Sequence, residues 1–261
     1  MIPSTKIFYG WYVILTGGIL YVTISGLYWS GLSFYYLPVS QDLDISPVAI
    51  SLAFGLQRLT AGINAPFSGY LVDRFGARRM IPIGGTIAGI GFILFSMVSS
   101  YLTFLIVLLG LLSIGFSTGY DQGVLSSPNR WFIRHRARAL SYVMAGARIG
   151  TLALAPLVGL LVVHVGWKPT ALISGMVVLV VGWASFAVIR NFPEDMGLIP
   201  DGDPLSDGNY KIVEDPELLI PAQPQFTALE GYRTPTYWVL AVAMGLRVGA
   251  YIGFLVHFVP I

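Results

Sequence analysis

The chain has 261 residues, of which 55% are hydrophobic and only 11% carry a charge. An ordinary soluble domain has about 25% charged residues, so this composition excludes a soluble globule. The 30 glycines fit packed transmembrane helices better than a soluble core. Because the chain has no cysteine, disulfides, thiolate metal sites and a cysteine nucleophile are excluded as well. We predict an all-α membrane protein.

Seven apolar stretches are long enough to cross a bilayer, for which a helix needs about 20 residues. The first is too long for the apolar region of a signal peptide, so we expect it to be retained. The last ends at Ile261 without a polar or basic flank, and we expect that the chain is a fragment that stops inside a helix. The predicted helices cover residues 9–37, 47–72, 80–99, 101–126, 137–163, 169–190 and 236–261.

The basic residues between these helices indicate their orientation. If successive helices alternate in direction, one side of the membrane receives only Lys168. The positive-inside rule therefore places the other side, which includes the N-terminus, in the cytoplasm. The 11 of the 15 basic residues that fall on that side are Lys6, Arg74, Arg78, Arg79, Arg130, Arg134, Arg136, Arg138, Arg190, Lys211 and Arg233.

Residues 191–234 differ from the rest of the chain in being acidic and rich in proline. They contain nine Asp and Glu residues, two basic residues and six prolines, a composition typical of a linker with little regular structure. We therefore predict three parts: a six-helix transmembrane bundle at residues 1–190, a cytoplasmic linker at 191–234, and transmembrane helix 7 at 235–261.

The turn after the second predicted helix carries the most specific motif, which reads G-Y-L-V-D-R-F-G-A-R-R from Gly69 to Arg79. Gly76 permits a tight turn with positive φ. The Asp73 carboxylate can pair with Arg74 or face the positive N-terminus of another helix. An alternative interpretation is a basic hairpin that only follows the positive-inside rule.

This ordered motif resembles the one between helices two and three of the major facilitator superfamily, although Ala77 stands where many members have a basic residue. Further segments resemble the bacterial monocarboxylate/oxalate–formate branch of that superfamily. They are F-Y-G-W-Y from Phe8, Trp131-Phe132 followed by Arg134, Arg136 and Arg138, Gly166-Trp167-Lys168, and P-E-D-M-G-L-I-P-D-G from Pro193.

The resemblance implies the first six-helix half of a secondary active transporter, followed by the truncated start of a second half. It implies alternating-access transport of a small organic anion, either a monocarboxylate or a dicarboxylate, with coupling to a proton or a counter-anion left open. A monomer in the inner (plasma) membrane is implied too. The residues that it assigns to a conformational gate on the cytoplasmic side are Gly69, Asp73, Arg74, Gly76, Arg78 and Arg79.

Three arginines, Arg58, Arg148 and Arg247, lie within apolar stretches. At 1.5 Å per residue, Arg148 is roughly 15 Å from the basic anchor Arg138, near the middle of the bilayer. An arginine that faces lipid at this depth costs about 2.5–3.5 kcal/mol or more, so these side chains should face protein or water. They are candidate ligands for an anionic substrate, because a guanidinium matches carboxylate geometry.

The alternative role for these arginines is structural, as internal ion-pair partners of Asp121, which also lies in an apolar stretch. Asp121 and His257 are candidates for proton coupling. The glycines Gly84 and Gly89 lie inside apolar helices and are predicted packing sites.

Other classes of function have no motif in the sequence. We find no phosphate-binding loop, His-rich metal cluster or nucleophile–base arrangement, so we expect no enzyme, cofactor or metal. Because the basic residues flank membrane helices, we expect lipid and not nucleic acid as their surroundings. The alternative to transport is a membrane scaffold or sensor that retains the bundle without turnover.

Overall fold

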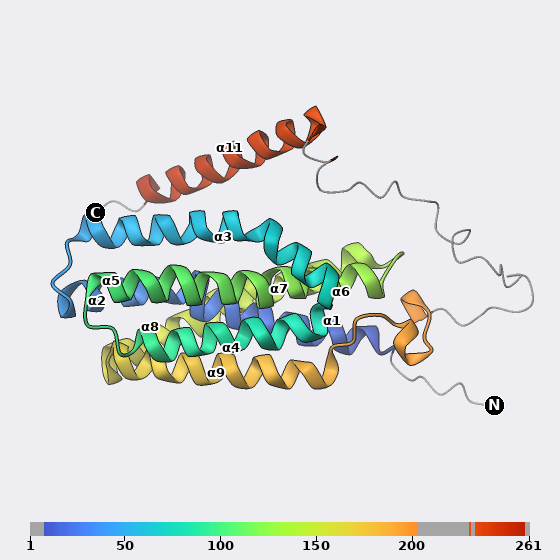
Figure 1. The fold of residues 1–261 in the computed structure, drawn as a ribbon, viewed down its shortest axis with the longest axis horizontal. Coiled ribbons are helices and arrows are strands. Elements are labelled where there is room, and N and C mark those ends of the chain that lie inside the picture. The colour runs from blue at the N-terminus through green and yellow to red at the C-terminus, as the bar shows by residue number, and fades with distance from the viewer. Residues whose placement is uncertain (1–7, 203–229, 231–232, 259–261) are drawn as a thin grey trace, which may run out of the picture. The chain divides into compact units, whose positions relative to one another are not determined.

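The computed structural model describes residues 8–202, 230 and 233–258, with side chains up to residue 247 (Figure 1). Its contacts divide the chain into two compact units, Met1–Pro204 and Leu205–Ile261, which are considered separately below. The described residues form helices joined by short turns and contain no strand. The all-α prediction is confirmed for this part of the chain.

The first helical segment is continuous but changes its winding. A π-helical stretch and a 3-10 stretch interrupt it, and together the pieces span 33 residues. The helix continues to Asp42, whereas the prediction ended it at residue 37. The prediction stopped early because the last turn is polar and the apolar pattern does not extend into it. Its elements are α1 (Gly10–Thr23), η1 (Ile24–Trp29), η2 (Gly31–Tyr35) and α2 (Tyr36–Asp42).

The next two helices, α3 (Pro47–Phe75) and α4 (Ala77–Phe95), form a hairpin. Ser46 caps α3 in the usual way, because its hydroxyl accepts a hydrogen bond from the Ala49 N–H at 3.2 Å, and Pro47 fits the first helical position. The hairpin turns at a single residue, Gly76, whose φ of 82° favours glycine.

The remaining segments of the first unit are two long helices with π-helical stretches, one regular helix and two short 3-10 turns. They are α5 (Tyr101–Leu105), η3 (Ile106–Ser113), η4 (Phe116–Gln122), α6 (Gly123–Trp131), α7 (Arg136–Ile149), η5 (Gly150–Leu154), α8 (Ala155–Val165), α9 (Trp167–Val188), η6 (Glu194–Met196) and η7 (Pro200–Gly202). In the second unit the described helix is α11 (Pro235–Phe258).

Five of the described segments are long and apolar enough to cross a membrane. Neither α3 nor α11 is among them, so the predicted count of six spans and a truncated seventh remains a prediction. α3 has 29 residues, but it carries Gln57, Arg58 and Asn64 within its length and is therefore less apolar. The five segments are Gly10–Asp42, Ala77–Phe95, Tyr101–Trp131, Arg136–Val165 and Trp167–Val188.

α4 lies beside α9, as Figure 1 shows, and glycines allow it to pack closely on its neighbours. A Cβ added to Gly84 would lie 2.5 Å from the Gly119 backbone, and one added to Gly89 would lie 3.0 Å from the Gly175 carbonyl oxygen. Helices in membranes associate through such small residues. The predicted packing role of Gly84 and Gly89 is therefore confirmed.

Candidate functional site

Several loops of the first unit meet at the end of the bundle that carries Gly76, Trp131 and Asn191, which we call the turn end (Figure 1). There α3 ends, α4 begins, α6 ends and α9 runs out into residues 189–202. Most of the polar side chains that the resemblance assigned to a gate lie at this end, together with partners that the motif did not identify.

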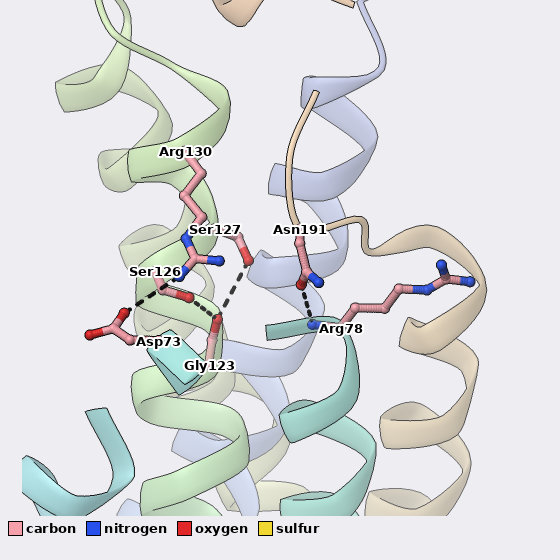
Figure 2. Close-up of polar contacts among 7 residues, drawn as sticks. All are labelled: Asp73, Arg78, Gly123, Ser126, Ser127, Arg130 and Asn191. Carbon is pink, nitrogen blue, oxygen red and sulfur yellow. Dashed lines mark hydrogen bonds and ion pairs between the residues drawn. The ribbon is translucent and has the colours of Figure 1, made fainter. Parts of the chain in front are cut away.

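Asp73 forms an ion pair across the bundle, with Arg130 on α6 (Figure 2). The Arg130 guanidinium nitrogen lies 3.4 Å from the Asp73 carboxylate, whose side chain is 78% exposed. An exposed pair of this kind is worth about 0–1 kcal/mol. The structure therefore gives Asp73 a partner other than Arg74, which donates to the Tyr70 hydroxyl at 3.0 Å.

The start of α4 is held by Asn191, which follows the end of α9. The Asn191 side-chain oxygen accepts a hydrogen bond from the Arg78 backbone N–H at 3.0 Å (Figure 2). The Arg78 guanidinium lies over the Phe186 ring, 4.6 Å from its centroid, while Arg79 is exposed. These contacts join the turn to α9 as well as to α3.

A small recess opens beside Asp73, with a volume of about 200 Å³. α3 contributes one wall and the end of the α6 segment contributes the other. The Ser126 hydroxyl in this wall donates to the Gly123 carbonyl at 2.9 Å (Figure 2). The recess is lined by Gly69, Val72, Asp73, Gln122, Leu125, Ser126 and Asn129.

The loop between α6 and α7 binds a carboxylate from the chain itself. Asp201 accepts hydrogen bonds from three successive backbone N–H groups, of Ile133, Arg134 and His135, at 3.0, 2.8 and 3.1 Å. Partial burial by itself would raise the pKa of Asp201, but these donors outweigh it and hold the pKa below its usual range. Asp201 also has a positive φ of 65°, which is uncommon outside glycine.

In the middle of the bundle, Asp121 lies in η4 and is partly buried. The Tyr21 hydroxyl on α1 donates to its carboxylate at 2.9 Å. Within residues 8–202, Asp121 makes no ion pair with either Arg58 or Arg148, which was the structural alternative for these arginines. The partner of this acid is a tyrosine.

Arg58 and Arg148 are exposed on the surface of the first unit, on α3 and near the end of α7. Neither makes an ion pair or a side-chain hydrogen bond with another described residue. One turn beyond Arg148, the Thr151 hydroxyl lies 2.7 Å from the Ser25 hydroxyl, which donates to the Ala147 carbonyl at 2.6 Å. The Ser25 and Thr151 hydroxyls are thus linked to the Ala147 carbonyl, one residue before Arg148.

The two remaining candidates lie in the second unit. Arg247 is an exposed residue of α11. His257 belongs to the same helix, but its side chain lies outside the described residues.

Sequence reasoning missed Asn191, Asp201 and Tyr21 as members of these contacts. Asn191 and Asp201 were assigned only to an acidic linker, and Tyr21 to an apolar helix. The one available signal was the positive-φ tendency of an Asp before Gly at positions 201–202. The other two residues carry no local signal, because their partners are about a hundred residues away.

The long apolar segments and their exposed hydrophobic side chains define a multi-pass membrane protein. A family model described as Major Facilitator Superfamily matches residues 18–261. Since this match covers most of the chain, the protein belongs to the major facilitator superfamily.

The relatives that it resembles include transporters of organic anions by name. The oxalate:formate antiporter of Oxalobacter formigenes is 28% identical over 233 residues, which are 89% of this chain and 51% of the antiporter. Monocarboxylate transporter 12 of Xenopus laevis is 34% identical over 110 residues, 42% of this chain and 24% of that protein. Monocarboxylate transporter 11 of Homo sapiens is 30% identical over 128 residues, which are 47% of this chain and 25% of that protein.

The chain spans about half the length of the antiporter. The two monocarboxylate transporters match over about a quarter of their own length. The resemblance that the motifs indicated, to the superfamily and to its monocarboxylate/oxalate–formate branch, is confirmed by these matches.

Proposed function

We propose that the protein is a secondary active transporter of a small organic anion, a monocarboxylate or a dicarboxylate, that works by alternating access. The observation that carries this proposal is the contrast between Asp121 and the two arginines of the first unit. Asp121 is hydrogen-bonded to Tyr21, whereas Arg58 and Arg148 are exposed on helices of a membrane protein. Cations at this depth are costly in lipid, so they favour a water-filled path with an anionic ligand.

A second six-helix half completes this transporter in our proposal. The chain covers about half of the oxalate:formate antiporter, and superfamily members bind substrate between two halves at the middle of the membrane. Residues 1–190 then form the first bundle, 191–234 the linker, and 235–261 the first helix of the second bundle. Arg247 would approach the substrate from the side opposite Arg148.

The turn end serves as the cytoplasmic gate in this proposal. Its Asp73–Arg130 pair joins α3 to α6, and its Asn191–Arg78 hydrogen bond joins α4 to the segment after α9, without burying a strong ion pair. Weak, exposed pairs suit a contact that must break and re-form in each cycle. Asp121, together with His257, remains the candidate for carrying a coupled proton.

The orientation belongs to the same proposal and has its own test. A reporter fused within residues 201–217 should report the cytoplasm, and one next to Lys168 should report the outside of the inner membrane. If both fusions report the same side, the orientation and the number of spans are wrong together.

Transport is tested with the protein encoded by the complete gene, purified as a monomer and reconstituted in lipid vesicles. We expect saturable uptake of radiolabelled oxalate, formate or lactate, accelerated by the same anion inside the vesicle or by a proton gradient. Uptake no faster than into empty vesicles would reject the transporter and support a scaffold or sensor. A soluble signalling domain encoded beyond Ile261 would support the same alternative.

A further inference from the structure

The start of α4 has no capping side chain of its own. A helix leaves its first four N–H groups without partners inside the helix, and Ser, Thr, Asp or Asn at the N-cap usually accepts one of these hydrogen bonds. The N-cap of α4 is Gly76, which has no side chain. The N–H of Arg78, the second residue of α4, donates instead to Asn191 at 3.0 Å.

The Asn191 side chain packs directly against the backbone of Gly76. A Cβ added to Gly76 would lie 2.6 Å from the Asn191 Cγ atom, far inside van der Waals contact. Gly76 is therefore required twice, once for its positive φ and once for the space in which the amide lies. Asn191 therefore acts as the capping residue of α4, because the glycine at the N-cap has no side chain that could accept the hydrogen bond.

The segment that holds Asn191 is itself fixed on both sides. The Trp131 indole N–H donates to the Arg190 carbonyl at 3.0 Å. On the other side, the Phe192 ring lies 4.8 Å from the guanidinium carbon of Arg130, the partner of Asp73. The amide thus links the start of α4 to the elements that carry the Asp73–Arg130 pair.

We propose that Asn191 is a positioning residue for the gate, which caps α4 from the end of α9 and holds the turn in the geometry that pairs Asp73 with Arg130. This inference rests on the proposed role of the turn end as a gate. When the cap is removed, the start of α4 is free to move, and the turn end opens more often. A turn end that opens more often changes the rate of the cycle more than the affinity for substrate.

Three substitutions separate the hydrogen bond from the shape of the side chain. Asn191→Asp keeps an oxygen acceptor and places a negative charge at a helix N-terminus, where it is favoured. Asn191→Leu keeps nearly the same shape without an acceptor, and Asn191→Ala removes both. The matched control is Ser46→Ala, which removes the N-cap of α3 at the opposite end of the bundle.

The readout uses the lack of cysteine in these 261 residues. Ser126→Cys places a single thiol in the recess beside Asp73, in a background in which any cysteine of the complete protein is replaced by serine. Its rate of labelling by a water-soluble maleimide reports how often the turn end opens. We expect Asn191→Leu and Asn191→Ala to raise this labelling rate about fivefold. This factor corresponds to the ~1 kcal/mol that a typical helix cap contributes.

Asn191→Asp should label like the parent, and Ser46→Ala should do so even though it lowers the melting temperature. In reconstituted vesicles, Asn191→Leu should change the maximal uptake rate and leave KM nearly constant. If Asn191→Leu and Ser46→Ala both lower the melting temperature with labelling unchanged, Asn191 is only a stabilising residue and the inference is rejected. If Asn191→Ala does not fold, the labelling rates of Asn191→Asp and Asn191→Leu still decide whether the hydrogen bond positions the turn.

Failure of the proposed function is recognised separately. If the parent protein transports no anion, the transporter assignment fails, whereas the labelling rates still decide whether Asn191 positions the turn.

Discussion

The turn end and the middle of the first unit use polar residues in opposite ways. At the turn end, a charged or polar side chain from one element contacts another element: Asp73 with Arg130, and Asn191 with the start of α4. In the middle, the Tyr21–Asp121 hydrogen bond is internal, but Arg58 and Arg148 are exposed and make no ion pair or side-chain hydrogen bond with another described residue. In our proposal the turn end is complete within one bundle, whereas the middle is incomplete and receives a ligand and a second half.

The largest effect should follow from Arg148→Ala, which removes a cation from the incomplete middle. We expect uptake of the anion to fall at least about tenfold, since a charge-assisted contact is worth about 1.5–3 kcal/mol. Uptake by Arg148→Lys, which keeps the charge but loses the planar fork, should lie between that of the parent and that of Arg148→Ala. Uptake is measured in vesicles, with Lys168→Ala as the control that removes an exposed cation elsewhere.

A double substitution tests whether Arg148 acts on Asp121 instead. If Arg148→Ala combined with Asp121→Ala restores the uptake that each single change destroys, the two residues neutralise each other. That result would show that Arg148 does not bind the substrate. The middle would then use its polar residues as internal partners, as the turn end does.

Next in size is Asp73→Asn at the complete end. The substitution removes the ion pair with Arg130, so we expect normal membrane insertion and a several-fold lower transport rate. Insertion is checked by expression and by melting temperature, and transport by uptake. Unchanged uptake would leave the motif as a basic hairpin that serves topology alone.

Tyr21→Phe probes the internal pair of the middle and should act on stability. Loss of a hydrogen bond to an acidic group costs about 1.5–3 kcal/mol when the group remains partly buried. We expect a lower melting temperature for Tyr21→Phe, and no further loss when Asp121→Asn is added. Tyr35→Phe, which breaks a longer 3.3 Å contact with Ser174, should cost less; an equal cost would show that the Tyr21–Asp121 bond is not special.

The smallest effect concerns pH and Asp201. Since the folded pKa lies below that of the unfolded chain, the stabilisation is fully present above the ordinary Asp pKa of about 3.9 and is lost as pH falls through the folded value. Asp201→Asn should therefore lower stability at pH 7 by at most ~1 kcal/mol, because the carboxylate is only partly buried and solvent screens it. The difference in melting temperature from the parent should shrink at more acidic pH; a constant difference would contradict the assignment.

The sequence predicted those features that depend on local composition. Apolar stretches located every long helix described within residues 8–202, although not the short turns η6 and η7, and the isolated Gly76 located the tight turn between α3 and α4. Helix ends were less accurate: the helix predicted to stop at residue 126 runs to Trp131, because an apolar ruler measures lipid thickness rather than helix length.

Contacts between distant side chains were beyond the reach of the sequence. Whether Tyr21 or an arginine meets Asp121 depends on how each helix is rotated about its axis, and π-helical turns such as η4 shift that rotation. In the same way, Asn191 contacts Arg78 only because α9 ends at the level where α4 begins. No periodicity of either segment contains this information.

The glycine contacts of α4 have a consequence for how this chain can change over generations. Gly84 meets the Gly119 backbone, so at that crossing one main chain lies directly against another with no side chain between them, whereas Gly89 meets both the Gly175 carbonyl oxygen and the Leu179 side chain. A methyl group added on one side finds no space unless the helices move apart along their whole length. Such pairs cannot drift one position at a time, and variants of this protein should either keep both glycines of a crossing or rebuild the crossing as a whole.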